Sequence, residues 1–248
     1  MAGYKSFIQN PKKQVVGKTI RLDPKESHHL IKVLRAQEGS NVTVLNESGK
    51  TWKTTIKIAN SKKAILQIES YIERPRPNRP KIILVQALVK GKTMDSIIQH
   101  TTEIGVDRII PITSDQSEVT LDKARQLSKH EKWTTVIKEA CKQSGNPFLP
   151  FIDTIRSFEN WTQHIPANSL VLVASLQDGS TSLKEALDAM KTDEIEKIFF
   201  IIGPEGDFSD NEYKQLKAID CKPISLGNNV LRAETAAICA IHQIISAF

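Results

Sequence analysis

Hydrophobic and polar residues alternate along short segments near the start of the chain. Residues 41–69 contain "NVTVLN", "KTTIKI" and "AILQIE", and the glycine-containing turn "ESGK" lies between the first two. Alternation with a period of two is typical of strands that bury one face. We therefore predict a small β-barrel or sandwich in this part of the chain.

One helix is expected to interrupt these strands, in "ESHHLIKVLRAQEG". Its apolar residues Leu30, Val33 and Leu34 have helical spacing, and Gly39 is the expected end. The adjacent histidines suggest a metal site, but neighbouring side chains point about 100° apart on a helix. Because no other ligand cluster appears in the sequence, we expect no metal.

After residue 80 the pattern changes to strands that alternate with helices. "KIILVQALV", "RIIPIT", "SLVLVASL" and "KIFFII" have the continuous apolar composition of buried strands. "TMDSIIQHTTEIG", "KHEKWTTVIKEACKQSG", "SLKEALDAM" and "AETAAICAIHQIISAF" have helical periodicity, and the last has Ile238, Ile241, Ile245 and Phe248 in its apolar stripe. The alternation predicts an α/β fold with a mostly parallel sheet, in which ligands bind at the carboxyl ends of strands.

The two patterns meet at "ERPRPNRPK", residues 73–81, whose three prolines favour an extended linker. We predict an N-terminal domain at 1–73, a linker at 74–81 and a C-terminal domain at 82–248. Residues 1–80 carry 16 Lys and Arg against 6 Asp and Glu, whereas residues 81–248 carry 18 against 22. A basic N-terminal segment is suited to binding a polyanion, although a lysine-rich solubilising surface would have the same composition.

Composition excludes several other classes of protein. The three cysteines, Cys141, Cys221 and Cys239, form no CxxC pair and cannot all pair, which favours a reducing compartment and structural thiols. No segment approaches the roughly 18 consecutive apolar residues of a membrane span, and the first residues lack the apolar core of a signal peptide. We therefore expect a cytoplasmic protein that does not enter a membrane.

The segment "IFFIIGPEGDFSDNE", residues 198–212, joins a buried strand to a capped helix. The five residues from Ile198 to Ile202 are apolar, as in a strand buried on both faces. Ser209 and Glu212 have the spacing of a capping box, which would start the next helix. The turn between them is thus expected to lie between two rigid elements at the carboxyl edge of the sheet.

The composition of this turn limits its ligand. Gly203 and Gly206 permit positive φ and close approach of the backbone to a ligand, and Pro204 stiffens the turn. A phosphate loop would need spare N–H groups and a lysine, but this turn offers Glu205 and Asp207 instead. No histidine or third acid completes a metal site nearby. An ordinary turn before a capped helix is the alternative to a ligand-binding loop.

A second loop of the same kind occurs in "KPISLGNNVLRAETA". A short strand through Leu226 is followed by a turn that begins at Gly227, and a helix follows with Glu234 in its first turn. Two such loops would present backbone groups suited to an adenine and a ribose. Arg232, the only arginine after Arg156, adds a cation beside them, unless it forms a salt bridge to a nearby glutamate.

"IIGPEGDFSDNE" and "LGNNVLRAETAA" together resemble the SPOUT-class RNA methyltransferases, specifically the RsmE type, which methylates N3 of a uridine in 16S ribosomal RNA. "HHLIKVLRAQEGS", "KGKTMDSIIQHTTEIGVDRIIPITSDQSEV" and "KWTTVIKEACKQSGNPFLP" are similar to further motifs of that family, in the same order. The resemblance covers essentially the whole chain. The sequence departs from the family pattern in "YKSFI", which lacks an initial arginine, and in "GPEGD", where the family commonly has "GPEGG".

The resemblance implies a PUA-like N-terminal β-barrel and a C-terminal SPOUT α/β domain with a deep trefoil knot, an exception to unknotted topology. It also implies a homodimer that acts on 16S rRNA of the small ribosomal subunit. The cofactor would be S-adenosylmethionine, bound by three loops. Its expected contacts are Leu176, Ile202, Gly203, Glu205, Gly206, Leu226, Gly227, Asn228, Val230 and Leu231.

The expected chemistry gives Arg232 a catalytic role. Uracil N3 is a poor nucleophile until it loses its proton, and Arg232 would stabilise the resulting anion, while no general base is assigned. His29, Arg35 and Lys92 are the candidate RNA contacts. Methylation of another RNA position, such as a tRNA ribose or guanine, and RNA binding without catalysis are the alternatives.

Overall fold

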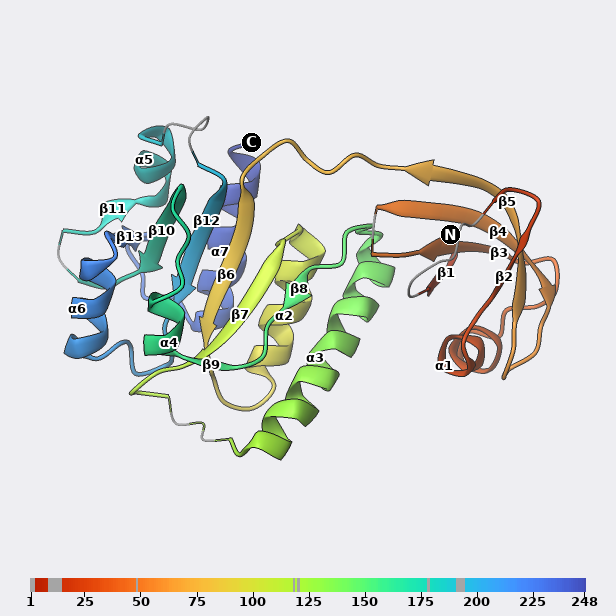
Figure 1. Ribbon diagram of the computed structural model, residues 1–248, viewed down its shortest axis with the longest axis horizontal. Coiled ribbons are helices and arrows are strands. Elements are labelled where there is room, and N and C mark those ends of the chain that lie inside the picture. The colour runs from red at the N-terminus through yellow and green to blue at the C-terminus, as the bar shows by residue number, and fades with distance from the viewer. Residues whose placement is uncertain are drawn as a thin grey trace. The chain divides into compact units, whose positions relative to one another are not determined.

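The computed structural model describes residues 3–8, 15–47, 49–117, 119, 121–177, 179–190 and 195–248 (Figure 1). These residues pack into two compact units, one within Met1–Pro77 and Lys138–Leu149, the other within Asn78–Ile137 and Pro150–Phe248. Residues 138–149, which follow the expected linker in the sequence, thus pack with the N-terminal unit. The domain limits 1–73 and 82–248 stay predictions.

The first unit is built around a five-stranded sheet in the order β1-β3-β4-β5-β2. Its strands are β1 (Tyr4–Phe7), β2 (Thr19–Arg21), β3 (Asn41–Leu45), β4 (Lys50–Ile58) and β5 (Ile65–Glu73). The strands predicted from alternation are confirmed as β3, β4 and β5, and they pair antiparallel in sequence. The core of this unit includes Trp52, Val44 and Leu66, which are 2% exposed or less. Alternation placed these side chains on the inner face.

The helix expected in residues 26–39 is shorter and wider than predicted. An α-helical turn, α1 (Pro24–His28), continues as a π-helical turn, η1 (His29–Val33). Asp23 caps α1 by accepting a hydrogen bond from the Glu26 amide at 2.8 Å. A π turn has more than 3.6 residues, so helical spacing no longer predicts which side chains share a face.

The burial of this segment corrects the sequence prediction. Arg35 has φ +57 and ends the helical conformation, four residues before Gly39. Val33 is 57% exposed and Leu34 is 38% exposed, whereas Leu30 and Ala36 are buried. The π turn thus rotates Val33 and Leu34 out of the core that they were expected to join.

The second unit contains a sheet in the order β11-β13-β10-β12-β6-β7-β8, and β9 also pairs with β7. All of the recorded pairs are parallel. The strands are β6 (Lys81–Ala87), β7 (Arg108–Thr113), β8 (Phe151–Ile152), β9 (Arg156–Ser157), β10 (Ser169–Ala174), β11 (Thr181–Ser182), β12 (Lys197–Ile202) and β13 (Lys222–Ser225). The predicted α/β fold with a mostly parallel sheet is confirmed, and the trefoil knot stays a prediction.

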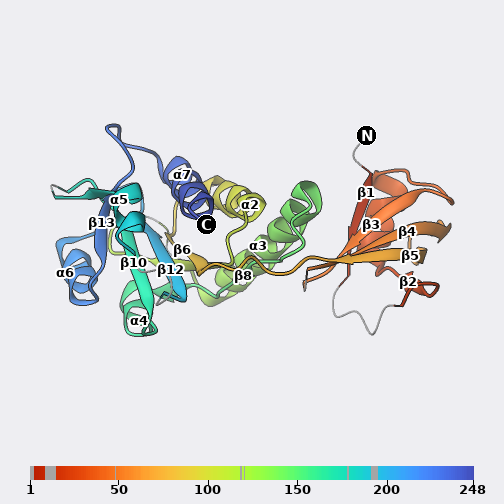
Figure 2. The ribbon, with the colours of Figure 1, turned by 90° about the horizontal axis from the view of Figure 1, so that it is seen from above.

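Helices cover both faces of this sheet, with α2, α5 and α7 on one face and α4 and α6 on the other (Figure 2). Their bounds are α2 (Thr93–Ile104), α4 (Phe158–Thr162), α5 (Leu183–Asp188), α6 (Asp210–Ala218) and α7 (Ala233–Ser246). A longer helix, α3 (Lys123–Ser144), begins in the second unit and ends in the first. The glycine predicted to end α2 is its C-cap, Gly105, with φ +110.

The last helix packs through a different stripe from the one predicted. Its buried residues are Ala236, Ala237, Ala240, Ile241 and Ile244. Of the four residues in the predicted stripe, Ile241 alone is buried, and Phe248 is 45% exposed. The buried stripe thus combines the small side chains of Ala236, Ala237 and Ala240 with Ile241 and Ile244, and it leaves Ile238 and Ile245 partly exposed.

No helix in the described part of the chain is both long enough and apolar enough to span a membrane.

Candidate active site

Three neighbouring strands end at one edge of the second unit's sheet. β10 pairs with β12 on one side and with β13 on the other, all parallel, so their carboxyl ends lie together. A pocket of about 450 Å³ opens there. Its volume lies in the range of small-molecule sites, and it is at the edge where open parallel sheets bind ligands.

The loop between β12 and α6 is fixed by a capping box. Ser209 Oγ accepts a hydrogen bond from the Glu212 amide at 3.2 Å, and a Glu212 carboxylate oxygen accepts one from the Ser209 amide at 2.9 Å. Glu212 is 2% exposed and also accepts from Ser114 Oγ and the Asp115 amide. The predicted cap is confirmed, and it also joins this loop to the segment after β7.

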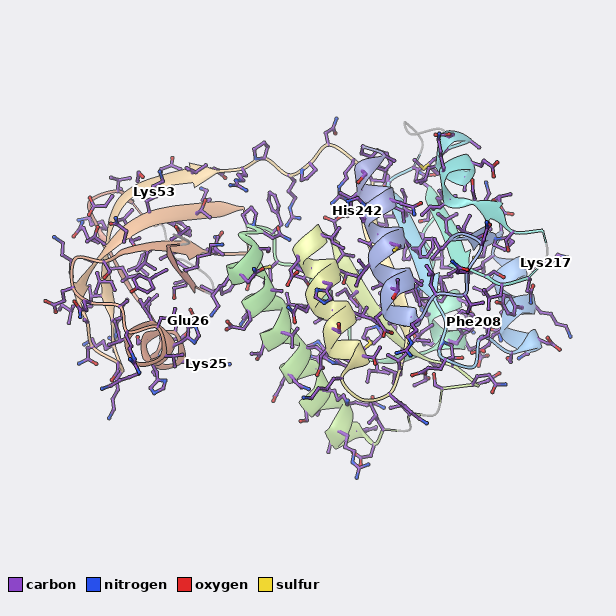
Figure 3. The ribbon with its side chains drawn as sticks, turned by 180° about the vertical axis from the view of Figure 1, so that it is seen from behind. Lys25, Glu26, Lys53, Phe208, Lys217 and His242 are labelled. Atoms are coloured by element: carbon purple, nitrogen blue, oxygen red, sulfur yellow. The ribbon has the colours of Figure 1, made fainter. Side chains whose placement is uncertain are left out.

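The glycines of the loop have a different role from the one predicted. Neither Gly203 nor Gly206 has positive φ, and the residue in the left-handed region is Asp207, with φ +63. A Cβ on Gly203 would lie 3.3 Å from the Phe208 ring, and one on Gly206 would lie 3.4 Å from Gln116 Cβ. Gly203 therefore allows close packing of the Phe208 ring, whereas a Cβ on Gly206 would make an ordinary van der Waals contact (Phe208 is labelled in Figure 3).

Asp207 forms a hydrogen-bonded cluster with Tyr213 on α6. Tyr213 Oη lies 2.9 and 3.1 Å from the two carboxylate oxygens of Asp207, and the Phe208 amide donates to Asp207 Oδ1 at 2.8 Å. Burial raises the pKa of Tyr213 to about 12; its contact with Ser175 acts against this rise and the Asp207 carboxylate adds to it. Tyr213 is therefore a neutral donor at physiological pH.

The loop between β13 and α7 forms the opposite wall. Gly227 has φ +128, a conformation that favours glycine, and its amide lies 3.4 Å from Ser225 Oγ. Val230 is 75% exposed at the pocket. Arg232 is the N-cap of α7, and its side chain is exposed. Within the described residues it forms no salt bridge, so neither Glu205 nor Glu234 neutralises it.

Most of the predicted cofactor contacts line this pocket. Eight of the ten do so: Leu176, Ile202, Gly203, Glu205, Leu226, Gly227, Val230 and Leu231. The predicted catalytic residue, Arg232, lies in the same wall, whereas Gly206 and Asn228 are not among the lining residues. Gly206 instead faces Gln116. These positions support the assignment of the site, and the contacts themselves stay predictions.

Sequence reasoning missed several lining residues, including Thr93, Ser175, Asp207 and Asn229. Thr93 begins α2, far away in sequence, and the Lys90 amide just before it donates to Glu205 Oε1 at 3.2 Å. Nothing in the local sequence indicates this contact between two loops. Asp207 could have been found, because it directly follows the turn that the sequence marked as a ligand loop.

The candidate RNA contacts lie at accessible positions of both units. In the first unit, His29 is partly exposed at the start of η1, and Arg35 is exposed where that turn ends. In the second unit, exposed Lys92 is the N-cap of α2, next to the pocket residue Thr93. Their contact with RNA stays a prediction.

Cys141 and Cys221 have the properties of structural thiols. Burial raises the pKa of Cys141 and of Cys221 to about 12, so both are protonated at neutral pH and are poor nucleophiles. No group of three or more His, Cys, Asp and Glu residues in the described ranges could hold a metal ion.

Two family models match the chain. The RNA methyltransferase domain matches residues 76–245, and the RNA methyltransferase PUA domain matches residues 22–69. The second match identifies the N-terminal β unit as the expected PUA-like domain. The first match includes every residue that lines the pocket, and the second includes α1 and most of the antiparallel strands of the first unit.

Similar proteins agree with these matches. Ribosomal RNA small subunit methyltransferase E of Bacillus subtilis is 27% identical, over 96% of this chain and 94% of its own length. The Synechocystis protein of the same name is 30% identical, over 93% of this chain and 74% of its own. A Legionella pneumophila structure described as a methyltransferase in complex with the bound cofactor SAM has a TM-score of 0.87 at 28% identity, covering 98% of both chains. The chain therefore belongs to the ribosomal RNA small subunit methyltransferase E family of RNA methyltransferases.

Proposed function

We propose that this protein transfers a methyl group from S-adenosylmethionine to N3 of a uridine in 16S rRNA. The observation that carries the proposal is the pocket at the ends of β10, β12 and β13, which brings Arg232 beside eight of the ten predicted cofactor contacts. The relatives named above supply the substrate class, ribosomal RNA of the small subunit. The similar Legionella structure supplies the cofactor.

The pocket fits an adenosyl group in size and chemistry. Its volume of about 450 Å³ accommodates a ligand of nucleoside size, and its walls combine apolar side chains with loop backbone. Leu176, Leu226, Val230 and Leu231 would cover the adenine and ribose. The bound cofactor supplies a methyl group on a positively charged sulfur. None of the described lining residues is a lysine, in keeping with a ligand that has no phosphate.

Arg232 would act on the uracil. Removal of the N3 proton leaves negative charge on the ring and its two carbonyl oxygens, and an arginine can stabilise that charge through directed hydrogen bonds. The side chain is exposed at the pocket wall and has no salt-bridge partner among the described residues, so its charge is available to a substrate.

The N-terminal unit would bind the rRNA. The excess of Lys and Arg in residues 1–80 suits contact with phosphates, and His29 and Arg35 are the candidate contacts within it. Lys92, beside the pocket, would contact the RNA near the target base. A uracil N3 is accessible only in a single-stranded or flipped nucleotide.

The protein would act in the cytoplasm as a homodimer. Ile238 and Ile245 are partly exposed on α7, and Phe248 follows them at 45% exposure, which leaves an apolar face that a second copy of the chain would cover. Light scattering tests this directly, because a mass near the monomer value of 27.7 kDa would contradict a dimer.

The decisive experiment uses methyl-labelled S-adenosylmethionine and small ribosomal subunits that lack the modification. Label in 3-methyluridine after nucleoside analysis supports the proposal, and the Arg232→Ala variant is the matched control. Label in another nucleoside would overturn the substrate position and keep the methyltransferase. Absence of label with any RNA, despite cofactor binding, would overturn the reaction.

A further inference from the structure

The Asp207 carboxylate is held in a fixed position in the pocket wall. Tyr213 Oη donates to it from α6, and the Phe208 amide donates from the next residue. A Cβ on Gly203 would lie 3.6 Å from Asp207 Oδ1, so the carboxylate lies over the end of β12. Asp207 is partly buried and lines the pocket. A carboxylate in this position acts on a ligand with little loss of side-chain entropy.

The backbone conformation of Asp207 is unusual, and it also indicates that this residue is held in a fixed position. Its φ of +63 lies in the left-handed region, which Asp and Asn adopt more readily than other non-glycine residues. The Asp207 amide donates to the Pro204 carbonyl at 3.1 Å, which closes the turn. Such a conformation persists where the surrounding contacts determine it, and it is concentrated at ligand sites.

The pocket as a whole is negatively charged. Among its described lining residues, Glu205, Asp207 and Glu234 are acidic and Arg232 alone is basic. Glu205 is exposed, and one of its oxygens accepts a hydrogen bond from the Lys90 amide. Asp207 is less accessible to water, so its charge acts on a ligand with less screening than a fully exposed charge.

We propose that Asp207 makes this pocket prefer the cationic methyl donor to the uncharged thioether product. This inference rests on the proposed function. S-adenosylmethionine has a positively charged sulfur, and the product, S-adenosylhomocysteine, has lost that charge with the methyl group. A fixed carboxylate attracts the donor more strongly than the product, so it favours exchange of spent product for new donor. Asp207 is thus a specificity residue for the charge state of the cofactor.

The test is calorimetric binding of three ligands to three proteins. The ligands are S-adenosylmethionine, S-adenosylhomocysteine and sinefungin, in which a protonated amine replaces the sulfonium. The proteins are the full chain, Asp207→Asn and Asp210→Asn. Asparagine keeps the size of the side chain, its acceptor oxygen and its tolerance of positive φ. Asp210 is exposed in the first turn of α6 and outside the pocket lining, so it is a matched control.

The expected result is a selective loss for the cationic ligands. Asp207→Asn weakens binding of S-adenosylmethionine and sinefungin about tenfold and leaves S-adenosylhomocysteine within about twofold, whereas Asp210→Asn changes none of the three. The preference of the unaltered protein for the donor also shrinks as salt is raised.

Two outcomes would overturn the inference. Equal weakening of all three ligands by Asp207→Asn would show that the residue acts through the shape of the loop, and no change would show that its charge is irrelevant. Failure of the unaltered protein to bind either adenosyl compound is a different result, because it would refute the proposed function itself. Thermal unfolding of each variant shows separately whether the fold is intact.

Discussion

The Nζ atom of Lys142, on α3, lies 3.0 Å from Glu26 Oε1, on α1, within the N-terminal unit (Glu26 is labelled in Figure 3). The two side chains are only 6% and 12% exposed. Glu26 also accepts hydrogen bonds from Ser6 Oγ at 2.6 Å and from the Phe7 amide at 3.0 Å. This ion pair thus joins three segments that are far apart in sequence.

Removal of one partner is expected to destabilise the protein strongly. Lys142→Met leaves a buried carboxylate without its cation, which costs about 3–5 kcal/mol in the free energy of unfolding. The control is Arg125→Met, which removes an exposed pair with Asp122 and costs at most about 1 kcal/mol. Urea unfolding measures both. Similar losses for the two variants would contradict the prediction.

The same pair predicts how stability depends on pH. Burial would raise the pKa of Glu26, but the Ser6 hydrogen bond, the Lys142 charge and the Phe7 amide together lower it below the ordinary value of 4.5. The folded pKa is then lower than the unfolded one. The stabilisation is complete above pH 4.5 and is lost as the pH falls through the folded pKa.

The experiment compares the pH dependence of unfolding in the unaltered protein and in Glu26→Gln. The variant is expected to lose less stability than the unaltered protein as the pH falls below 4.5, because it has no carboxylate to protonate at this position. Identical acid slopes for the two proteins would contradict the assignment of Glu26.

Arg232→Ala is expected to reduce turnover far more than cofactor affinity. Loss of one preorganised charge at a reacting group costs about 10²–10³ in rate, while the cofactor dissociation constant should stay within about threefold. Single-turnover methylation and calorimetry measure the two quantities. Arg232→Lys, which keeps the charge but not the planar fork, should be intermediate. Equal losses of rate and affinity would make Arg232 a binding residue.

Alanine substitutions at Gly39 and Gly49 separate the cost of a left-handed backbone conformation from the cost of a steric clash. Gly39 and Gly49 have φ +83 and +89, but a Cβ on Gly39 would meet nothing within 4 Å. On Gly49 it would lie 2.4 Å from the Phe148 ring and 2.9 Å from the Arg74 carbonyl oxygen. We expect Gly39→Ala to cost about 1 kcal/mol and Gly49→Ala about 1–3 kcal/mol more. Equal unfolding midpoints would refute the clash.

The two capping boxes offer another matched comparison. Glu212 is buried and bonds to two residues outside its own helix, whereas Glu185, in the Ser182 box, is exposed. Glu185→Ala should change stability little, because its exposed carboxylate bonds only to the Ser182 amide. Glu212→Ala should cost about 1–3 kcal/mol, because it leaves the partly buried Ser114 hydroxyl and Asp115 amide without their acceptor, and it should weaken cofactor binding. Thermal unfolding and calorimetry distinguish these effects.

Sequence reasoning succeeded where structure is decided locally. The apolar run of β12, the Ser209 cap and the Gly105 terminus each follow from a few adjacent residues, and the structure confirms them. Sequence reasoning failed where contacts between residues far apart in the sequence determine the local structure. Gly206 faces Gln116, 90 residues earlier in the chain, and no pattern near residue 206 indicates that contact.

The same limit explains the two incorrect helix faces. A period of 3.6 placed Val33 and Leu34 in the core, but the chain widens into a π turn there. In α7, hydrophobicity favoured isoleucines as the inward residues, yet Ala237 and Ala240 are buried, whereas Ile238 and Ile245 are partly exposed. Propensity identifies a helix more reliably than it identifies the residues that face the core.

The path of the chain between its two units restricts how this protein could gain or lose its N-terminal part. The chain leaves the first unit after Pro77, returns at Lys138 and leaves again after Leu149. Deletion of residues 1–77 alone would remove Glu26, which pairs with Lys142, and Arg76, which lies over the Phe148 ring. A fragment that contains only residues 1–77 would lack Lys142, the cation that neutralises Glu26. Gain or loss of this unit by recombination therefore requires matched changes at two separate places in the gene.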